Sequence, residues 1–267
     1  MPYNYIIGSG WWCSEPDEDT RAERIGDDGI RSEGFHDLWY QSICQTSHPQ
    51  KIIIIDSNSP ITPPINKQDS RIEHLRLNTN AGHSTNHTGN FCGCMRAMIL
   101  GIEYAAMCDT DYYVYVEQDA LLKGSGIIEY CIDKMKTPYM FGAGEGTPQP
   151  TQQSLFIIRR DGFDTFIQRL KSIKALDNKI SPEEKFEIAT LTKLRKTAEY
   201  LASHKIHWRQ VSLKEWIYKE YRGYDQLPIG YGRQRPINFS DKYYYFQHGE
   251  NIELERYFKE TNTTDNK

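Results

Sequence analysis

The sequence predicts a mixed α/β fold with a mostly parallel central sheet and helices on both faces of that sheet. Four consecutive isoleucines within residues 51–56 indicate a strand buried on both faces, as strands of parallel sheets are. Apolar β runs alternate with helical segments along the first half of the chain, and such units form parallel sheets with right-handed connections. With 267 residues, 38% of them hydrophobic, the chain can bury the core that one such domain needs.

The elements of the first half are assigned from the spacing of their apolar residues. The predicted strands cover residues 3–7, 51–56, 73–77 and 111–116. The predicted helices cover residues 35–44 and 91–107, and polar loops fill residues 14–33 and 78–90. Polar residues follow every strand. In a parallel sheet these tips gather at one edge, which is where α/β proteins bind ligands.

The strand over residues 111–116 stops at two carboxylates, Glu117 and Asp119, which are separated by one residue. Side chains two positions apart in an extended segment point to the same face, so this pair can meet a hard divalent cation that carries phosphate oxygens. The alternative interpretation is an exposed acidic turn. A dinucleotide-binding fingerprint is excluded, because Gly8-Ser9-Gly10 is followed by two tryptophans and a cysteine rather than by a third glycine that opens a helix.

Composition excludes some partners. A net charge of −4 argues against a nucleic-acid binder that relies on a broad basic surface. No apolar run reaches the ~18 residues of a membrane span, and the N-terminus lacks a signal-peptide pattern, so we expect a cytoplasmic protein without an integral membrane segment. The 6 cysteines show no Cys-x-x-Cys spacing and are expected to be reduced, structural thiols. The high aromatic content suits stacking on sugars or bases as well as a core.

These residues resemble the nucleotide-sugar glycosyltransferases of the GT-A fold, particularly the family 2-like enzymes. The matching segments lie in the first half of the chain: the first strand, residues 52–57, residues 89–105, and the Asp-Tyr-Tyr-Val-Tyr-Val-Glu-Gln-Asp passage of residues 111–119. Asp119 is retained at the position that usually coordinates the metal in this motif. The first acidic position is Glu117 rather than the family's Asp, so the resemblance assigns the metal bond to Asp119 and not to Glu117.

The resemblance implies roles for individual residues. Asp119 and the late His248 would bind a divalent metal, Mn²⁺ or Mg²⁺, and Asp56 would accept a hydrogen bond from the nucleobase. The other expected donor-binding residues are Gly8, Ser9, Ser57, Glu117, Gln118, Arg233 and Arg235. Asp56 has a turn-forming role as its alternative, and His248 has a structural or surface role.

The two arginines lie in a glycine-rich segment, residues 223–236. Glycines permit movement and arginines match phosphate geometry, so this segment is predicted as a mobile loop that closes over a diphosphate. An ordinary solvated turn is the alternative. The aromatic segment that follows, residues 243–248, is β-like and ends at His248.

The general base is sought among the acidic residues of the second half. Residues 139–146 form a glycine-rich passage, and residues 152–158 are predicted as another buried strand. Ser181 and Pro182 mark a helix start, where Glu183 and Glu184 oppose the helix dipole. Acceptor-side helices of the resembled family often present an acidic base near their start, so either glutamate is a candidate general base. The fallback carboxylates are Glu145 and Asp164, and His83 and His87 stay unassigned.

We therefore expect one GT-A-like, Rossmann-related domain over residues 1–267. Its nucleotide-sugar-binding half spans residues 1–122, its acceptor-binding half and closing loop span residues 123–258, and residues 259–267 form a flexible tail. The expected activity is metal-dependent transfer of a sugar from a nucleotide-sugar donor to a saccharide or other hydroxyl acceptor, with inversion favoured. A sugar nucleotidyltransferase and a non-catalytic glycan-binding module are the alternatives. The sequence leaves the sugar, the base, the acceptor and the oligomeric state open.

Overall fold

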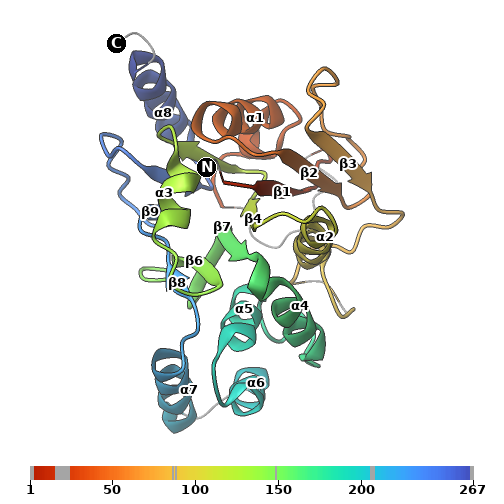
Figure 1. The fold of residues 1–267 in the computed structure, drawn as a ribbon, viewed down its shortest axis with the longest axis vertical. Coiled ribbons are helices and arrows are strands. Elements are labelled where there is room, and N and C mark those ends of the chain that lie inside the picture. Colours follow the sequence, from red (N-terminus) through yellow and green to blue (C-terminus); the bar gives the residue numbers. More distant parts are fainter. Residues whose placement is uncertain are drawn as a thin grey trace.

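The computed structural model describes residues 3–15, 25–85, 87, 89–147, 149–204 and 208–264. Its centre is a seven-stranded sheet with the strand order β3-β2-β1-β4-β7-β6-β8 (Figure 1). The strands are β1 (Tyr5–Trp11), β2 (Lys51–Asp56), β3 (Ile72–Arg76), β4 (Tyr112–Val116), β6 (Tyr139–Ala143), β7 (Thr151–Arg159) and β8 (Asp225–Gln226). Within this sheet β7 runs antiparallel to both of its neighbours, and every other pairing is parallel. The predicted mostly parallel α/β fold is therefore confirmed.

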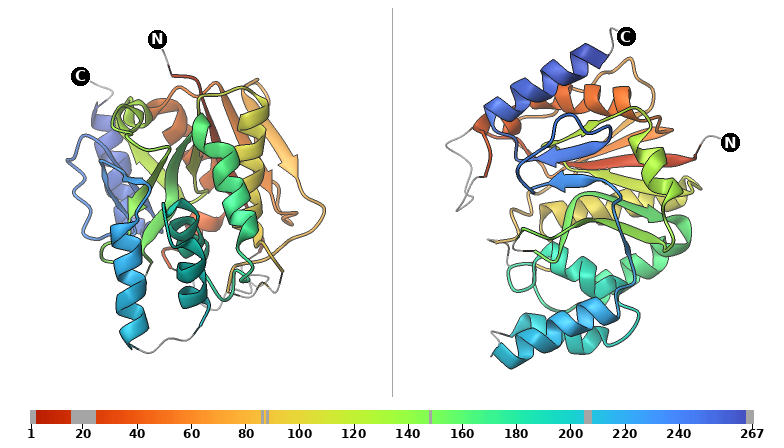
Figure 2. Two further views of the ribbon diagram at one scale, coloured as in Figure 1. Left: turned by 60° about the horizontal axis from the view of Figure 1, so that its bottom comes forward. Right: turned by 90° about the vertical axis from the view of Figure 1, so that its left-hand side faces the viewer.

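Helices cover both faces of the sheet. On one face pack α2 (Gly93–Met107), α4 (Phe163–Ser172) and α5 (Pro182–Thr190), and Figure 2 shows α2 and α4 side by side. On the other face pack α1 (Phe35–Thr46) and α3 (Ile127–Asp133). The isoleucines of β2 alternate between these layers: Ile53 and Ile55 join the α2 side, and Ile52 and Ile54 join the α1 side. The run is thus buried on both faces, as its composition predicts.

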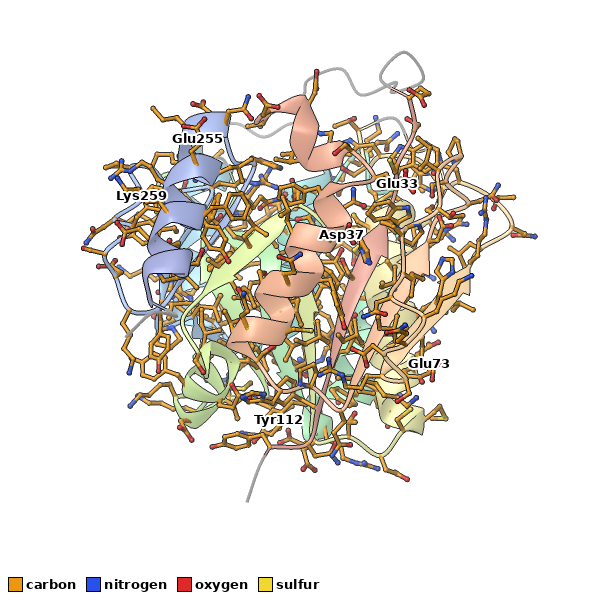
Figure 3. All side chains as sticks on the ribbon, turned by 90° about the horizontal axis from the view of Figure 1, so that it is seen from above. Glu33, Asp37, Glu73, Tyr112, Glu255 and Lys259 are labelled. Atoms are coloured by element: carbon orange, nitrogen blue, oxygen red, sulfur yellow. The ribbon has the colours of Figure 1, made fainter. Side chains whose placement is uncertain are left out.

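A second, three-stranded sheet joins the two halves of the chain. It pairs β5 (Ala120–Lys123) with β10 (Tyr244–Gln247), and β10 with β9 (Gly230–Gly232). The terminal helix α8 (Asn251–Thr264) covers it, and the Tyr257 hydroxyl of this helix donates to the Leu122 carbonyl at 2.6 Å. Figure 3 shows α8 beside α1, with Asp37, Glu255 and Lys259 on the surface. The short 3₁₀ helix η2 (Asp28–Arg31) lies next to α1.

The remaining helices form an outer layer next to α5. They are α6 (Arg195–Ser203) and α7 (Trp208–Glu220), which follow α5 along the chain, and the 3₁₀ turn η3 (Arg160–Gly162) precedes α4. Ile188 of α5, Ala198 and Leu201 of α6, and Ile217 of α7 share one apolar cluster. This cluster packs α6 and α7 against the last turn of α5.

The first strand extends further than its sequence predicts. Glycines after Ile7 indicate a turn, yet β1 continues through Gly8 and Gly10 to Trp11. A Cβ at Gly8 would overlap the Tyr113 ring of the neighbouring strand, and Gly101 of α2 is crowded by the same ring. These glycines therefore serve close packing of a tyrosine between a strand and a helix, and the predicted end of the strand at Gly8 is wrong.

The predicted loops and the predicted flexible tail agree with the structure to different degrees. Residues 16–24 of the predicted insert and residues 265–267 of the predicted tail lie outside the described residues. Residues 259–264, predicted as part of a flexible tail, continue α8, because Tyr257 anchors this helix in the core. The segment 223–236, predicted as a mobile loop, contains β8 and β9. All six cysteines are free thiols. In the part of the chain that the structure describes, we find no helix with the length and apolar character of a membrane span.

The fold contains a buried acid whose protonation should affect stability. Glu187 of α5 is 1% exposed and accepts a hydrogen bond from the Tyr224 hydroxyl at 2.7 Å. Burial raises the pKa of Glu187 to about 7. An unfolded chain has a glutamate pKa of about 4.3, so the folded state holds this proton more tightly, and the free energy of unfolding should fall as pH rises from about 5 to about 7.5.

Replacing this acid by its amide tests the assignment. Glu187→Gln keeps an acceptor for Tyr224, should remove this part of the pH dependence, and should be more stable than the wild type at pH 8 by about 2–3 kcal/mol. Urea unfolding at several pH values between 5 and 8 measures the difference. An identical fall of stability with pH in both proteins would contradict the prediction.

Candidate functional site

A cavity of about 1040 Å³ opens where β1, β2 and β4 end. Among the residues that line it are Gly10, Trp11, Trp12, Ser57, His83, Glu117, Gln118, Asp119, Gln153, Asp177, Glu183, Arg233, Arg235, Gln247 and His248. They come from both halves of the chain and from both sheets. The size and the position at the carboxyl ends of parallel strands are typical of ligand sites in α/β proteins.

Asp119 and His248 meet in this cavity because of one strand pairing. Asp119 immediately precedes β5, and β10 pairs with β5 so that Gln247 lies opposite Ala120. His248 therefore lies beside Asp119, with its Nε2 atom 3.5 Å from Asp119 Oδ2. The other carboxylate oxygen, Oδ1, and the other ring nitrogen, Nδ1, are buried without a hydrogen-bond partner among the described residues. Each group thus has one buried atom that the described residues leave unsatisfied.

The electrostatics of this pair follow from burial. Desolvation lowers the pKa of His248 to about 4, so its imidazole is neutral at neutral pH. Burial, together with the charge of Asp119, raises the pKa of Glu117 to about 8. The Gln247 amide donates to Glu117 Oε2 at 2.8 Å and orients that carboxyl group.

These groups fit a divalent metal ion. A neutral imidazole nitrogen and a carboxylate oxygen without a partner are both metal ligands. Among the described residues no group of three or more acidic, histidine or cysteine side chains forms a complete metal site. An ion here would need further oxygen ligands. Magnesium-type ions usually take them from substrate phosphates and water in addition to one or two carboxylates.

A second charged pair lines the cavity near the start of α5. Glu183 is 5% exposed, and its Oε1 atom lies 3.4 Å from the guanidinium of Arg233. Arg233 follows Gly232, which adopts a left-handed backbone with φ of 57°. The buried Gln152 side chain accepts from the Arg233 backbone N–H at 2.6 Å and donates to the carbonyls of Tyr231 and Ala143. The backbone of Arg233 is therefore held in place by Gln152 of β7.

Glu184, the other candidate base, is hydrogen-bonded to side chains of α7. Its Oε1 atom accepts from Lys214 Nζ at 2.6 Å and from the Tyr218 hydroxyl at 3.0 Å, both on α7. It does not line the cavity. Consecutive helical residues point in directions about 100° apart, which is why one glutamate faces the cavity and the other faces α7. The fallback carboxylates Glu145 and Asp164 do not line the cavity either.

Arg235 lines the cavity, but its guanidinium is already engaged. It ion-pairs with Glu253 of α8 and donates to the carbonyls of Gly232 and Gln247 at 3.0 Å. These contacts connect the segment after β9 to β10 and α8. The geometry favours a structural role for Arg235 and leaves Arg233 as the cation that faces Glu183.

The predicted donor-binding residues divide into two groups. Ser57 and Gln118 line the cavity, and the Gln118 amide makes two hydrogen bonds to the Trp12 backbone, at 2.6 and 2.9 Å. Gly8 and Ser9 do not line it, because β1 continues past them. Asp56 does not line it either.

The Asp56 side chain is fully buried. Its Oδ1 atom accepts from the Ser59 backbone N–H and from the Ser59 hydroxyl, both at 2.8 Å. The guanidinium of Arg76 lies 3.6 Å from Oδ2 and the ring of His74 lies 3.7 Å from it. This geometry favours the turn-forming alternative for Asp56 over a contact with a nucleobase.

Some cavity residues had no assignment from sequence. Trp11 and Trp12 directly follow Gly10 in the sequence, but no role was predicted for them. They line the cavity because β1 extends to Trp11. His83 lines the cavity and His87 does not.

Asp177 accepts from the Cys92 backbone N–H at 2.6 Å and ion-pairs with the buried Lys185, so it holds the start of α2. Gln153 and Asp177 stand in no motif, and no sequence signal singles them out.

The sequence gives no match to protein-family models and no match to curated proteins. Solved structures with a similar fold include the mannosyltransferase PcManGT from Pyrobaculum calidifontis, in complex with GDP-Man and Mn²⁺, at 9% identity and a TM-score of 0.46 over 83% of this chain and 70% of that chain. A cytidylyltransferase from Leptospira borgpetersenii has 11% identity and a TM-score of 0.42 over 85% of this chain and 76% of that one.

The glycosyltransferase GlyE of Streptococcus pneumoniae is similar at 11% identity and a TM-score of 0.41, over 85% of this chain. This chain spans 45% of the length of GlyE. These likenesses are too distant to indicate a function for this chain. The function proposed below therefore depends on the geometry of the site.

Glu184 is assigned a structural role, whereas Glu183 faces the cavity. A measurement of the free energy of unfolding tests the role of Glu184. Glu184→Ala removes the acceptor of two α7 side chains and should lower the free energy of unfolding by about 1–3 kcal/mol. Glu215→Ala, a change at an exposed position of α7, is the matched control and should stay within about 0.5 kcal/mol of the wild type. Urea unfolding measures both. Wild-type stability in Glu184→Ala would contradict the structural role.

Proposed function

We propose that this protein is a metal-dependent glycosyltransferase that moves a sugar from a nucleotide-sugar donor to a saccharide or other hydroxyl acceptor, with inversion at the transferred carbon. One observation supports this most strongly. A single cavity holds the Asp119–His248 pair, with its free ligand atoms, and also the Glu183–Arg233 pair. The first pair suits a cation bound to a diphosphate, and the second suits a general base next to a phosphate-binding arginine.

The donor side is built from Asp119, His248 and Arg233. Asp119 and His248 would hold Mn²⁺ or Mg²⁺, which when bound neutralises charge on the leaving diphosphate. Arg233 adds a second positive charge, and a guanidinium matches phosphate oxygens geometrically. Glu117 lies beside this pair and is oriented by Gln247, so it is a neighbour of the ion site rather than a required ligand. Trp12, at the tip of β1, offers an aromatic surface to the nucleoside.

The acceptor side is built around Glu183. Its carboxylate would take the proton of the acceptor hydroxyl as that oxygen forms a bond to the anomeric carbon. The bond from the anomeric carbon to the diphosphate breaks in the same step, and the electron pair leaves with the nucleoside diphosphate. A displacement of this kind from the face opposite the leaving group inverts the anomeric centre. Glu183 lines the same cavity as Asp119 and is buried beside Arg233, which supports its role as the base.

The released product separates this proposal from its main alternative. A glycosyltransferase releases a nucleoside diphosphate, whereas a sugar nucleotidyltransferase consumes a nucleoside triphosphate and releases pyrophosphate. We expect nucleoside diphosphate to accumulate when the protein is incubated with Mn²⁺, a nucleotide sugar and a panel of oligosaccharides. Chromatography of the nucleotides detects it. Pyrophosphate release from a nucleoside triphosphate and a sugar phosphate would contradict the proposal, and glycan binding indifferent to Mn²⁺ and nucleotide would favour a binding module.

The ion site is tested by binding rather than by turnover. Asp119→Asn should weaken Mn²⁺-dependent binding of a nucleoside diphosphate at least tenfold, about 1.4 kcal/mol, because the amide lacks the charge that holds the ion. His248→Ala should weaken it less. Isothermal titration with and without Mn²⁺ measures the affinities. Asp37→Asn, at an exposed position of α1, is the matched control and should bind as the wild type does. Unaltered metal dependence in Asp119→Asn would overturn the assignment.

A further inference from the structure

The strand β7 is irregular where it enters the cavity. Its pairing with β6 matches Phe156 to Phe141 and then Gln152 to Gly142. Three residues of β7, namely Gln153, Ser154 and Leu155, therefore have no counterpart on β6. Bulges of this kind re-aim side chains and are common next to active sites.

This bulge lies between the two charged pairs of the site. At one end the Ser154 carbonyl accepts the Glu117 backbone N–H at 2.8 Å, which ties the bulge to the metal side. At the other end the Thr151 hydroxyl donates to the Glu183 carbonyl at 3.3 Å, which ties the strand to the start of α5. Gln153 lies between these two anchors, and its side chain lines the cavity. A sugar held between the diphosphate and the general base would occupy the same region.

The Gln153 side chain is buried but incompletely hydrogen-bonded. It is 6% exposed, and its Oε1 atom has no hydrogen-bond partner among the described residues. The neighbouring Gln152 is equally buried, yet its amide makes three hydrogen bonds to the backbone. A buried amide oxygen without a hydrogen-bond partner is energetically unfavourable. This oxygen is closed to solvent, so a ligand hydroxyl reaches it only after the Gln153 side chain rotates toward the cavity, and a hydrogen bond formed there would remove this cost.

We infer that the Gln153 amide oxygen accepts a hydrogen bond from one hydroxyl group of the transferred sugar and thereby selects the donor. This inference rests on the proposed function. The amide oxygen only accepts hydrogen bonds, so it suits a hydroxyl group, which can donate one, rather than a phosphate oxygen, which also accepts. A donor that lacks this hydroxyl would leave the buried amide unpaired, and sites built to hydrogen-bond a hydroxyl discriminate strongly against such analogues.

The substitution Gln153→Leu tests the inference, because leucine fills a similar volume without a polar group. Titrations with Mn²⁺ compare nucleoside diphosphates, UDP and GDP, with their glucose and mannose conjugates. We expect the affinity of Gln153→Leu for the nucleotide sugar that the wild type binds to fall about 10- to 100-fold, with the affinity for the nucleoside diphosphate within about twofold of wild type. Gln226→Leu, the same change at an exposed position of β8, is the control and should change neither affinity. Thermal unfolding shows that both variants are folded.

A second arm uses nucleotide sugars that lack one hydroxyl at a time. In the wild type, removal of one particular hydroxyl should reproduce the 10- to 100-fold loss, and in Gln153→Leu the same removal should cause no further loss. Equal losses for the nucleotide sugar and the nucleoside diphosphate, or no loss for either, would overturn this inference while leaving the proposed function intact. A wild-type protein that binds no nucleoside diphosphate and no nucleotide sugar would overturn both.

Discussion

The pairing of β5 with β10 is the constraint on which the site depends. β5 begins one residue after Asp119, and the register that sets Gln247 opposite Ala120 brings His248 to the tip of β4. Asp119 and His248 are 129 positions apart in the sequence, just under half of the chain, and this pairing brings them together. The turn after β10 is fixed from a second side as well, because Gly26 packs so closely on His248 that a Cβ would overlap its backbone, and the Asp27 N–H donates to the Gly249 carbonyl. The histidine is thus held by the backbone before any ligand binds.

Burial of this region explains its unusual charge state. Bringing Glu117 and Asp119 together in a poorly solvated cavity raises the pKa of Glu117, and the same desolvation lowers the pKa of His248. Without a ligand the cluster reduces its own repulsion by protonation. A bound cation would shift this balance toward the carboxylate form, because it adds the positive charge that the cluster lacks. Arg233 supplies part of that charge and is held by Gln152, so its own position depends on β7.

The sequence predicted the parts of this arrangement that depend on local patterns. The isoleucines of β2, the acidic end of β4 and the Ser181 cap of α5 are each encoded within a few residues, and all three lie where their patterns indicate. The end of the first strand was wrongly predicted at Gly8. In a sequence, a glycine required for packing against Tyr113 cannot be distinguished from a glycine required for a turn. The choice between Glu183 and Glu184 could not be made, because it depends on where α7 packs. No role could be predicted for Gln153 from the sequence, because the role depends on a bulge that arises from the pairing of β6 with β7.

The direction of β7 has a consequence for the whole site. In a sheet whose strands all ran parallel, only strand ends and the loops after them would reach the cavity. Because β7 runs antiparallel to β4, its start lies at the same edge as the ends of β1, β2 and β4. The cavity therefore receives side chains from the start of a strand, where Gln152 pairs with Gly142 of β6 and the Ser154 carbonyl accepts the Glu117 N–H. Gln152 and Gln153 use this position in different ways, since one fixes Arg233 and the other faces the cavity. The single reversed strand thus contacts both charged pairs of the site, through Ser154 to Glu117 and through Thr151 to Glu183.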